Sequence, residues 1–316
     1  MNRILVIRGG AIGDFILTLP ALKALRDAYP EARIEILGYK HIAALAESRF
    51  YAQAARSIEY GPLSSFFARD SELPSELAIY FAGFDLILSY LYDPDGIFED
   101  NLRRCGARQI VRGPAKIDNS AHAAQQLAKP IEELGLRVME LAARFYPSAQ
   151  DRQFAREFLK DRAKPVVTLH PGSGSDKKNW PLRNWIALGN YLLDSARFAG
   201  SLLIVSGEAD GDQIAALEIE WKDRHVLFAK DMPLPHLAAV LEGTVFAGND
   251  SGISHLAAAA GADCILLFGP TNPEVWAPKN ENVGVLKAPG NDLARLDIDL
   301  VRDALDQALI RIGMRT

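Results

Sequence analysis

Short apolar runs alternate with amphipathic segments along the first half of the chain. Runs at 3–7 and 34–37 flank a stretch, 14–29, in which apolar residues recur every three or four positions. This alternation predicts strands separated by helices, and therefore a parallel sheet covered on both faces. Further apolar runs expected in this sheet occupy 78–82, 86–89 and 109–111, and a second helix is expected at 41–48.

A second alternating series occupies the rest of the chain. Its expected strands lie at 165–169, 202–205, 226–228, 245–247, 264–268 and 283–286. Helices are expected near 182–196, 210–222, 234–242, 251–260 and 297–312, and a charged stretch at 151–164 is expected to lead into the series as a helix. The fold class is therefore α/β, with two Rossmann-like parallel-sheet domains of similar length.

The domain boundary is placed between residues 155 and 156, within a segment bounded by Pro147 and Pro165. The final helix could pack on either domain. Open α/β sheets bind ligands at the carboxyl ends of their strands. Two such edges are expected to face each other across a cleft that holds the ligand.

Length, charge and cysteine content limit the classes of protein to which this chain could belong. A chain of 316 residues exceeds the size at which a single core stops growing, and its net charge of −5 argues against general nucleic-acid binding. No apolar stretch approaches the roughly 18 residues of a membrane span. Cys105 and Cys264 show no metal-ligand spacing, which favours a reduced, cytoplasmic protein.

The segment 243–278 carries the strongest chemical signal. An apolar strand ends in a glycine-containing turn, 248–252, from which an alanine-rich helix starts. The unpaired N–H groups and the positive end of the helix dipole would bind a diphosphate. We expect Asp250 to cap this helix and the N–H groups of Ser251, Gly252 and Ile253 to hold the phosphates. His255 is expected to pack beside the site rather than to catalyse.

Two other turns of the second domain could complete this site. The loop 169–181 is not a Walker A loop, but Ser173 offers a hydroxyl and Lys178 a charge for a phosphate. A solvated surface loop is its alternative interpretation. After the next strand, Glu208 could accept hydrogen bonds from ribose hydroxyls, and an ordinary exposed acid is an equal alternative.

The first glycine turn of the chain does not bind a dinucleotide. Arg8 stands where the fingerprint requires glycine, and Gly38 and Tyr39 stand where the acidic residue for a ribose is expected. The turn instead places Asp14 at the start of the first helix. Taken alone, Asp14 is best explained as a helix-capping residue.

A basic stretch in the first domain contains Arg104, Arg108 and Arg112. Such stretches are usually solvated faces, but this one could also lie against an anionic acceptor. No group of His, Asp and Glu has metal-ligand spacing, so a catalytic metal is not expected.

Three ordered motifs together resemble glycosyltransferase family 9, the lipopolysaccharide heptosyltransferases and their relatives, over nearly the whole chain. They are Gly13-Asp14 with 18–22 (TLPAL), 170–173 (HPGS) with 178–181 (KNWP), and 249–257 (NDSGISHLA) with 267–271 (LFGPT). The resemblance implies the GT-B fold, with an acceptor-binding domain at 1–155 and a nucleotide-sugar-binding domain at 156–316.

The resemblance also implies a mechanism. Asp14 would act as general base on an acceptor hydroxyl, which attacks the sugar with inversion, and Lys178 with the helix N-terminus would neutralise the diphosphate without metal or cofactor. The implied donor is ADP-heptose. The implied acceptor is a lipid-linked core oligosaccharide or related glycan, contacted by Gly10, Arg104, Arg108 and Arg112.

Such an acceptor would bring a cytoplasmic enzyme to the inner face of the cytoplasmic membrane, as a peripheral contact. Two alternatives stay open at this point. One is a GT-B nucleotide-sugar epimerase or hydrolase, and the other is a non-catalytic nucleotide-sugar-binding protein.

Overall fold

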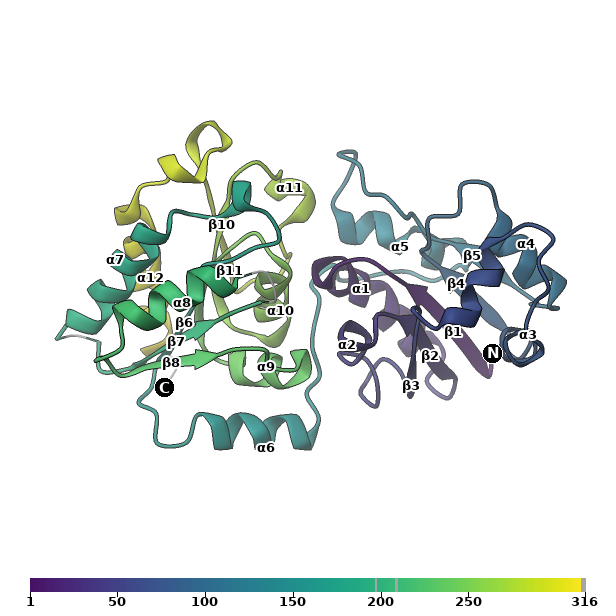
Figure 1. Ribbon diagram of the computed structural model, residues 1–316, viewed down its shortest axis with the longest axis horizontal. Helices are drawn as coiled ribbons and strands as arrows, with labels where there is room; N and C mark the ends of the chain where they lie inside the picture. The colour runs from purple at the N-terminus through teal and green to yellow at the C-terminus, as the bar shows by residue number, and fades with distance from the viewer. Residues whose placement is uncertain (197, 208–209, 314–316) are drawn as a thin grey trace. The chain divides into compact units, whose positions relative to one another are not determined.

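The computed structural model describes residues 1–196, 198–207 and 210–313. It divides into two compact units, Met1–Leu141 and Ala142–Thr316 (Figure 1). The boundary expected from the sequence, between 155 and 156, falls within helix α6 (Ala149–Phe158), which belongs to the second unit. Both units are built on parallel sheets, which confirms the predicted α/β class.

The sheet of the first unit has five parallel strands in the order β3-β2-β1-β4-β5. They are β1 (Arg3–Arg8), β2 (Arg33–Gly38), β3 (Ala54–Ser57), β4 (Leu86–Ser89) and β5 (Ile110–Arg112). The three central strands β1, β2 and β4 are buried at all or all but one of their positions, as expected of strands covered on both faces.

Helices cover both faces of this sheet. On one face, α1 (Ile12–Ala28) packs against α2 (Lys40–Ala43) and α5 (Ala123–Glu133). On the other lie η1 (Gly61–Phe67), α3 (Ser75–Ala82) and α4 (Ile97–Arg104), whose aromatic side chains form the core with β1, β2 and β4 (Figure 1).

Two expectations for the first unit are wrong. The apolar run 78–82 is part of helix α3 rather than a strand, because Leu77, Tyr80 and Phe81 recur at helical spacing and face the core. The helix expected at 41–48 is limited to the four residues of α2.

The sheet of the second unit has six parallel strands in the order β11-β10-β9-β6-β7-β8. They are β6 (Val166–His170), β7 (Ser201–Val205), β8 (Val226–Ala229), β9 (Val245–Asn249), β10 (Asp263–Phe268) and β11 (Val283–Lys287). Each overlaps a strand expected from the sequence.

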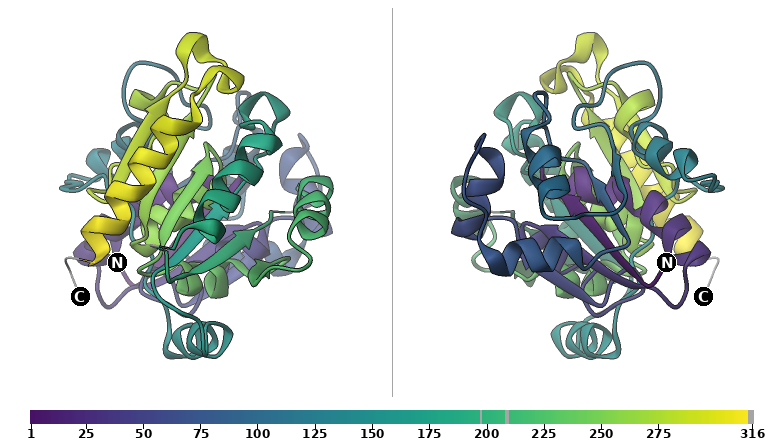
Figure 2. Two further views of the ribbon diagram at one scale, coloured as in Figure 1. Left: turned by 90° about the vertical axis from the view of Figure 1, so that its left-hand side faces the viewer. Right: turned by 90° about the vertical axis from the view of Figure 1, so that its right-hand side faces the viewer.

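One face of this sheet packs against α7 (Leu182–Asp194), α8 (Gly211–Glu220) and α12 (Ile298–Gly313) (Figure 2). On the other face α10 (Gly252–Ala260) contacts β9 and β10, and it packs on α9 (Leu234–Leu241), which in turn contacts α6. The final helix α12 belongs to this unit, because Val301, Leu305 and Ala308 are buried in its core.

Short elements complete the chain and connect its strands. They are η2 (Asp176–Lys178), α11 (Pro273–Trp276), η3 (Pro289–Asn291) and η4 (Leu293–Arg295). Within the described residues, none of the helices has the length and apolarity that crossing a bilayer requires.

In each sheet the first strand along the chain is an interior strand, and the later strands lie on both sides of it. In the first unit β1 lies between β2 and β4, and in the second β6 lies between β9 and β7. At such a switch point the connections leave in opposite directions and open a crevice outside the carboxyl ends of the strands. The loops after β1, β6 and β9 are therefore the places where each unit is built to bind a ligand.

Candidate functional site

The N-terminus of α10 lies at the switch point of the second sheet. Ser251 caps this helix, since its hydroxyl accepts a hydrogen bond from the Ser254 N–H at 3.2 Å. The sequence predicted Asp250 as the cap of this helix. The structure shows that Ser251 is the cap instead. Among the described residues, the N–H groups of Gly252 and Ile253 have no acceptor, because the first N–H groups of a helix lack partners within it.

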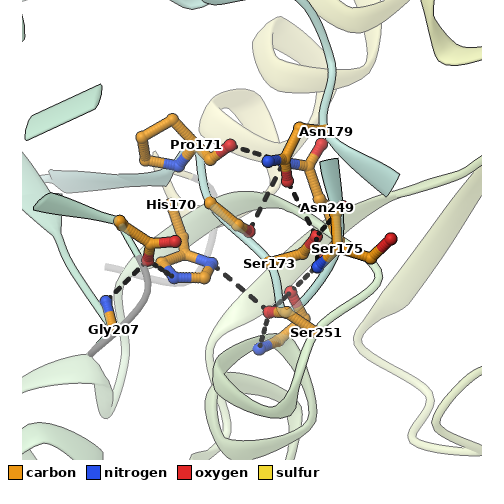
Figure 3. Close-up of polar contacts among 11 residues, drawn as sticks. His170, Pro171, Ser173, Ser175, Asn179, Gly207, Asn249 and Ser251 are labelled. Atoms are coloured by element: carbon orange, nitrogen blue, oxygen red, sulfur yellow. Dashed lines mark hydrogen bonds and ion pairs between the residues drawn. The ribbon is translucent and has the colours of Figure 1, made fainter. Parts of the chain in front are cut away.

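Asn249 joins this helix start to the loop that follows β6. Its side chain is fully buried, and its amide donates to the Pro171 carbonyl at 2.6 Å (Figure 3). The amide oxygen accepts from the Trp180 N–H at 3.1 Å. One residue thus holds both ends of the loop 171–180 against the carboxyl end of β9.

The anchored loop brings Lys178 beside α10. Its ammonium group lies 2.8 Å from the Asp250 carboxylate. The side chain of Asp250 is 6% exposed and that of Lys178 is 34% exposed, so the cation is the partner that solvent or a ligand can reach. These two residues, which the sequence assigned to one site from positions far apart in the chain, do lie together.

Three other predicted residues of this site differ in their placement. The Ser173 hydroxyl is buried and turned into its own loop, where it donates toward Asn179 Oδ1 at 2.7 Å. His255 is buried on α10, and its backbone N–H donates to Ser251. Glu208 lies outside the described residues.

A buried His170–Asp210 pair completes this edge, and sequence reasoning missed it. His170, the last residue of β6, has its Nε2 atom 3.1 Å from Asp210 Oδ2 and its Nδ1 atom 3.3 Å from the Ser251 hydroxyl. Figure 3 shows the imidazole between the Gly207 turn and Ser251. No local signal could reveal the pair, because 40 residues separate its members.

The charge on Asp210 is stabilised where it lies. Burial raises the pKa of its carboxyl, but the hydrogen bond and charge of His170 and the Gly207 N–H outweigh burial and leave the pKa below its ordinary value. The backbone approaches so closely that a Cβ on Gly172 would lie 1.8 Å from the carboxylate. Glycine is therefore required at position 172.

In the first unit, Asp14 lies in the first turn of α1, directly after the switch-point loop of β1. Its Oδ2 atom accepts a hydrogen bond from the Ala11 N–H at 3.0 Å, so the carboxylate does serve as a helix cap. The side chain is still 32% exposed, and Oδ1 lies 3.7 Å from the Arg8 guanidinium. Capping uses one carboxylate oxygen and leaves the other available to a ligand.

Arg8 is a second functional candidate that the sequence did not suggest. It is buried at the end of β1, and it donates to the Thr18 hydroxyl at 3.0 Å and to the Asp14 carbonyl at 3.2 Å. Burial lowers the pKa of the guanidinium, and the negative charge of Asp14 opposes that shift. Arg8, which stands where a dinucleotide-binding motif would require glycine, therefore holds the first turn of α1 in place.

The predicted arginines lie at different places in the first unit, and Arg112, the last residue of β5, is at the carboxyl edge that Gly10 also follows. Arg108 pairs with Asp85 at 2.7 Å, immediately before β4, and so lies at the amino edge of the sheet, whereas Gly10 follows the carboxyl end of β1. Arg112 lies 3.5 Å from Glu99. Arg104 donates to Asn101 at 2.6 Å and to the Ser71 carbonyl.

A different basic surface lines a cavity of about 440 Å³ beside the carboxyl ends of β2 and β3. The Arg56 guanidinium lies 4.2 Å from the centre of the Tyr80 ring, and within the described part of the chain no carboxylate pairs with it. The remaining lining residues are Leu37, Lys40, Ala55, Ser57, Tyr60, Leu63, Glu76, Leu77 and Phe81. The cavity thus combines an apolar floor with two cations and one acid.

Over residues 1–196, 198–207 and 210–313, His, Cys, Asp and Glu side chains form no group of three or more that could hold a metal ion. At the carboxyl edges of the two sheets, the charges described above are those of side chains and helix termini.

Comparison with known proteins places these features in a family. The family model described as glycosyltransferase family 9 (heptosyltransferase) matches residues 112–299, which is more than half of the chain. The lipopolysaccharide heptosyltransferase 1 of Escherichia coli O18:K1:H7 is 25% identical over 347 aligned positions, covering 99% of each chain.

Solved structures agree at the level of the fold. A family 9 glycosyltransferase from Veillonella parvula superposes with a TM-score of 0.78 at 18% identity, covering 98% of this chain and 97% of that one. The Escherichia coli heptosyltransferase WaaC, solved with ADP, gives a TM-score of 0.72 at 20% identity, covering 97% and 99%. This likeness confirms the GT-B fold expected from the sequence motifs.

The geometry predicts opposite outcomes for two neighbouring glycines. Gly10 has φ of +93°, and a Cβ on it would lie 2.9 Å from Asp14 Oδ2. We expect Gly10→Ala to lower the free energy of unfolding by about 1–2 kcal/mol and to displace the Asp14 carboxylate. A Cβ on Gly9 would approach no atom closer than 3.8 Å, so Gly9→Ala is the matched control. Chemical denaturation of both variants checks this, and equal stabilities would contradict it.

Proposed function

Because the chain belongs to glycosyltransferase family 9, we propose that it is an inverting glycosyltransferase that moves heptose from ADP-heptose to a hydroxyl of a lipid-linked core oligosaccharide. The observation that carries this proposal is the partly exposed Asp14 carboxylate, held by Arg8 and the Ala11 N–H at the switch point of the first sheet.

The second unit supplies the donor site in this proposal. The N–H groups of Gly252 and Ile253, the Ser251 hydroxyl and the Lys178 ammonium all lie at one edge and suit a diphosphate. The relatives are lipopolysaccharide heptosyltransferases, and one related structure contains ADP. Both facts support ADP-heptose as the donor.

Asp14 supplies the general base. It takes the proton of the acceptor hydroxyl while the hydroxyl oxygen attacks the anomeric carbon from the face opposite the diphosphate. The bond from the anomeric carbon to the phosphate oxygen breaks, and ADP leaves with that bonding pair. Lys178 and the start of α10 stabilise the charge that develops on the diphosphate, so we assign this role to the protein rather than to a metal ion or cofactor.

The cavity at Arg56 is our candidate for acceptor recognition. Its two cations suit the carboxylates or phosphates of an acidic core sugar, and its aromatic and apolar lining suits a sugar face. Such an acceptor is membrane-linked, so we place the reaction at the cytoplasmic face of the inner membrane, through peripheral contact alone.

Two substitutions of Asp14 separate its capping role from catalysis. An asparagine oxygen can still accept from Ala11 N–H but cannot take a proton. We therefore expect Asp14→Asn to keep the helix cap and to lower kcat by about 10²–10⁴-fold. Asp14→Ala is expected to lose both properties, with ADP affinity retained in each variant.

These variants are assayed by heptose transfer, thermal unfolding and ADP binding. Wild-type activity in Asp14→Asn would show that the carboxylate is only a cap. Release of free heptose without acceptor, at a rate similar to transfer, would favour a hydrolase. Donor binding with no turnover of any envelope acceptor would favour a binding protein.

The donor base is tested by calorimetric titration with ADP, UDP, GDP and CDP. We expect selective binding of ADP, weakened roughly ten- to a hundred-fold in Lys178→Ala, because a charged hydrogen bond to phosphate is lost and Asp250 is left without its counter-ion. Lys177→Ala is the matched control, since Lys177 is the exposed neighbour. Preference for another base would overturn the ADP-heptose assignment.

The acceptor site is tested by a pair of arginine variants. We expect Arg56→Gln to raise the KM for a core-oligosaccharide acceptor about tenfold, with the KM for the donor unchanged. Arg108→Gln, at the amino edge of the same sheet, should leave both values unchanged. A selective loss in Arg108→Gln would instead favour the arginine stretch as the acceptor surface.

A further inference from the structure

The buried His170–Asp210 pair contacts the proposed diphosphate site through a single hydroxyl, that of Ser251. The His170 side chain is 2% exposed and that of Asp210 is 3% exposed, whereas Ser251 is only partly buried. The pair therefore cannot touch a bound nucleotide directly from its interior position, but Ser251 can. The inference below rests on the proposed function, because it assumes that a diphosphate binds at the start of α10.

The hydrogen atoms of this network can be assigned from its acceptors. An ionised carboxylate only accepts hydrogen bonds, so the contact of 3.1 Å between Asp210 and His170 places a hydrogen on Nε2. In a neutral imidazole the other nitrogen, Nδ1, is then an acceptor. The Ser251 hydroxyl, 3.3 Å away, is the group that can donate to it.

The neighbouring serine does not change this assignment. The Ser254 hydroxyl donates to the Asn249 carbonyl, and the Ser254 N–H donates to Ser251 Oγ. Ser254 Oγ also lies 3.1 Å from Ser251 Oγ and is a second acceptor within reach of the Ser251 hydrogen. Donation to Ser254 would leave lone pairs of Ser251 Oγ and of a neutral His170 Nδ1 facing each other at 3.3 Å, so donation to His170 is favoured while the ring is neutral. Ser251 Oγ has one hydrogen, and a neutral His170 draws that hydrogen inward. The oxygen then presents a lone pair to a phosphate oxygen, which is unfavourable at a site that otherwise consists of donors.

We propose that His170 takes up one proton when a nucleoside diphosphate binds. Before protonation the Ser251 oxygen presents a lone pair to the phosphate, and after protonation the Ser251 hydroxyl can donate a hydrogen bond to it. In the protonated ring, Nδ1–H donates to Ser251 Oγ and frees the serine hydrogen to point at the ligand. The proton comes from solvent, stays on His170 while the ligand is bound and returns to solvent on release. His170 is thus a positioning residue that acts through Ser251.

The charged groups around His170 are consistent with this role. The residues before α8 contribute Asp210, and the start of α10 contributes Asp250, which is already paired with Lys178 from the loop after β6. From β9 the apolar Phe246 ring stacks on the imidazole with ring centres 6.5 Å apart. Glu208 lies outside the described residues. Among the described neighbours, Asp210 is the carboxylate in contact with the ring.

Two features of Asp210 suit it to support a charged imidazole. Interactions with His170 and the Gly207 N–H keep the pKa of the carboxyl below its ordinary value, so the carboxylate stays ionised wherever histidine titrates. The pair also changes from a net negative to a neutral unit on protonation. A diphosphate is therefore met by less negative charge in the protein.

Linkage fixes the sign of the pH dependence. A ligand that binds with uptake of a proton binds more tightly at low pH, and its affinity falls by up to about tenfold for each unit of rising pH in the window where uptake occurs. Measurements above pH 7 avoid the ligand's own titration, since a terminal phosphate has a pKa of about 6.

The test is calorimetric binding of ADP to the full chain at one pH above 7, in buffers with different ionisation enthalpies. The slope of observed enthalpy against buffer ionisation enthalpy gives the number of protons taken up. We expect uptake approaching one proton for the wild type and close to none for His170→Gln and Asp210→Asn. His225→Gln, an exposed histidine of the same unit, should retain the wild-type slope.

A second measurement needs no variant that could misfold. Nitrogen NMR shifts of His170 in the ¹⁵N-labelled wild-type protein should change from those of a neutral ring carrying its hydrogen on Nε2 to those of a doubly protonated ring when ADP is added. ADP binding without proton uptake and without this change would overturn the inference and leave the proposed donor intact. Absence of ADP binding would overturn both.

Discussion

The donor edge of this protein depends on the buried amide of Asn249. Its two hydrogen bonds, to Pro171 and Trp180, close the loop after β6 onto the end of β9. No apolar or charged side chain of similar size could donate and accept at these two positions together. Because the loop is closed, Lys178 meets Asp250. His170 meets Ser251 because β6 pairs with β9, where His170 lies opposite Gly248.

The first unit uses the same kind of edge for a different purpose. There the turn after β1 presents a carboxylate instead of N–H groups, and Arg8 occupies the space beneath the turn. A buried guanidinium is costly to desolvate, and its hydrogen bonds to Thr18 and the Asp14 carbonyl offset that cost. Two related sheets thus present opposite charges at equivalent switch points.

Much of this architecture could be predicted from the sequence, because parallel strands and glycine turns leave local patterns. The strands of the second unit, the Asp14 turn and the start of α10 all follow from such patterns. The sequence predicted a strand at 78–82, because a run of five apolar residues is compatible with both the strand period and the helix period. The structure shows a helix there and places Leu77 and Phe84 in the core on either side of this run.

Side-chain direction and long-range pairing left no local pattern. Nothing near Ser173 shows that its hydroxyl turns into its own loop, and nothing near Arg108 shows that it lies at the amino edge of the sheet. The His170–Asp210 pair and the cavity at Arg56 each combine residues from several elements. Only the three-dimensional fold brings their members together.

The placement of α12 has a consequence for synthesis. The first unit contains all of its strands and helices within the first 141 residues, so it can fold as soon as they leave the ribosome. The second unit needs Val301, Leu305 and Ala308 to fill its core, and these residues are made after all of its strands. A nascent or prematurely terminated chain would therefore carry a finished Asp14 unit beside an open, aggregation-prone sheet.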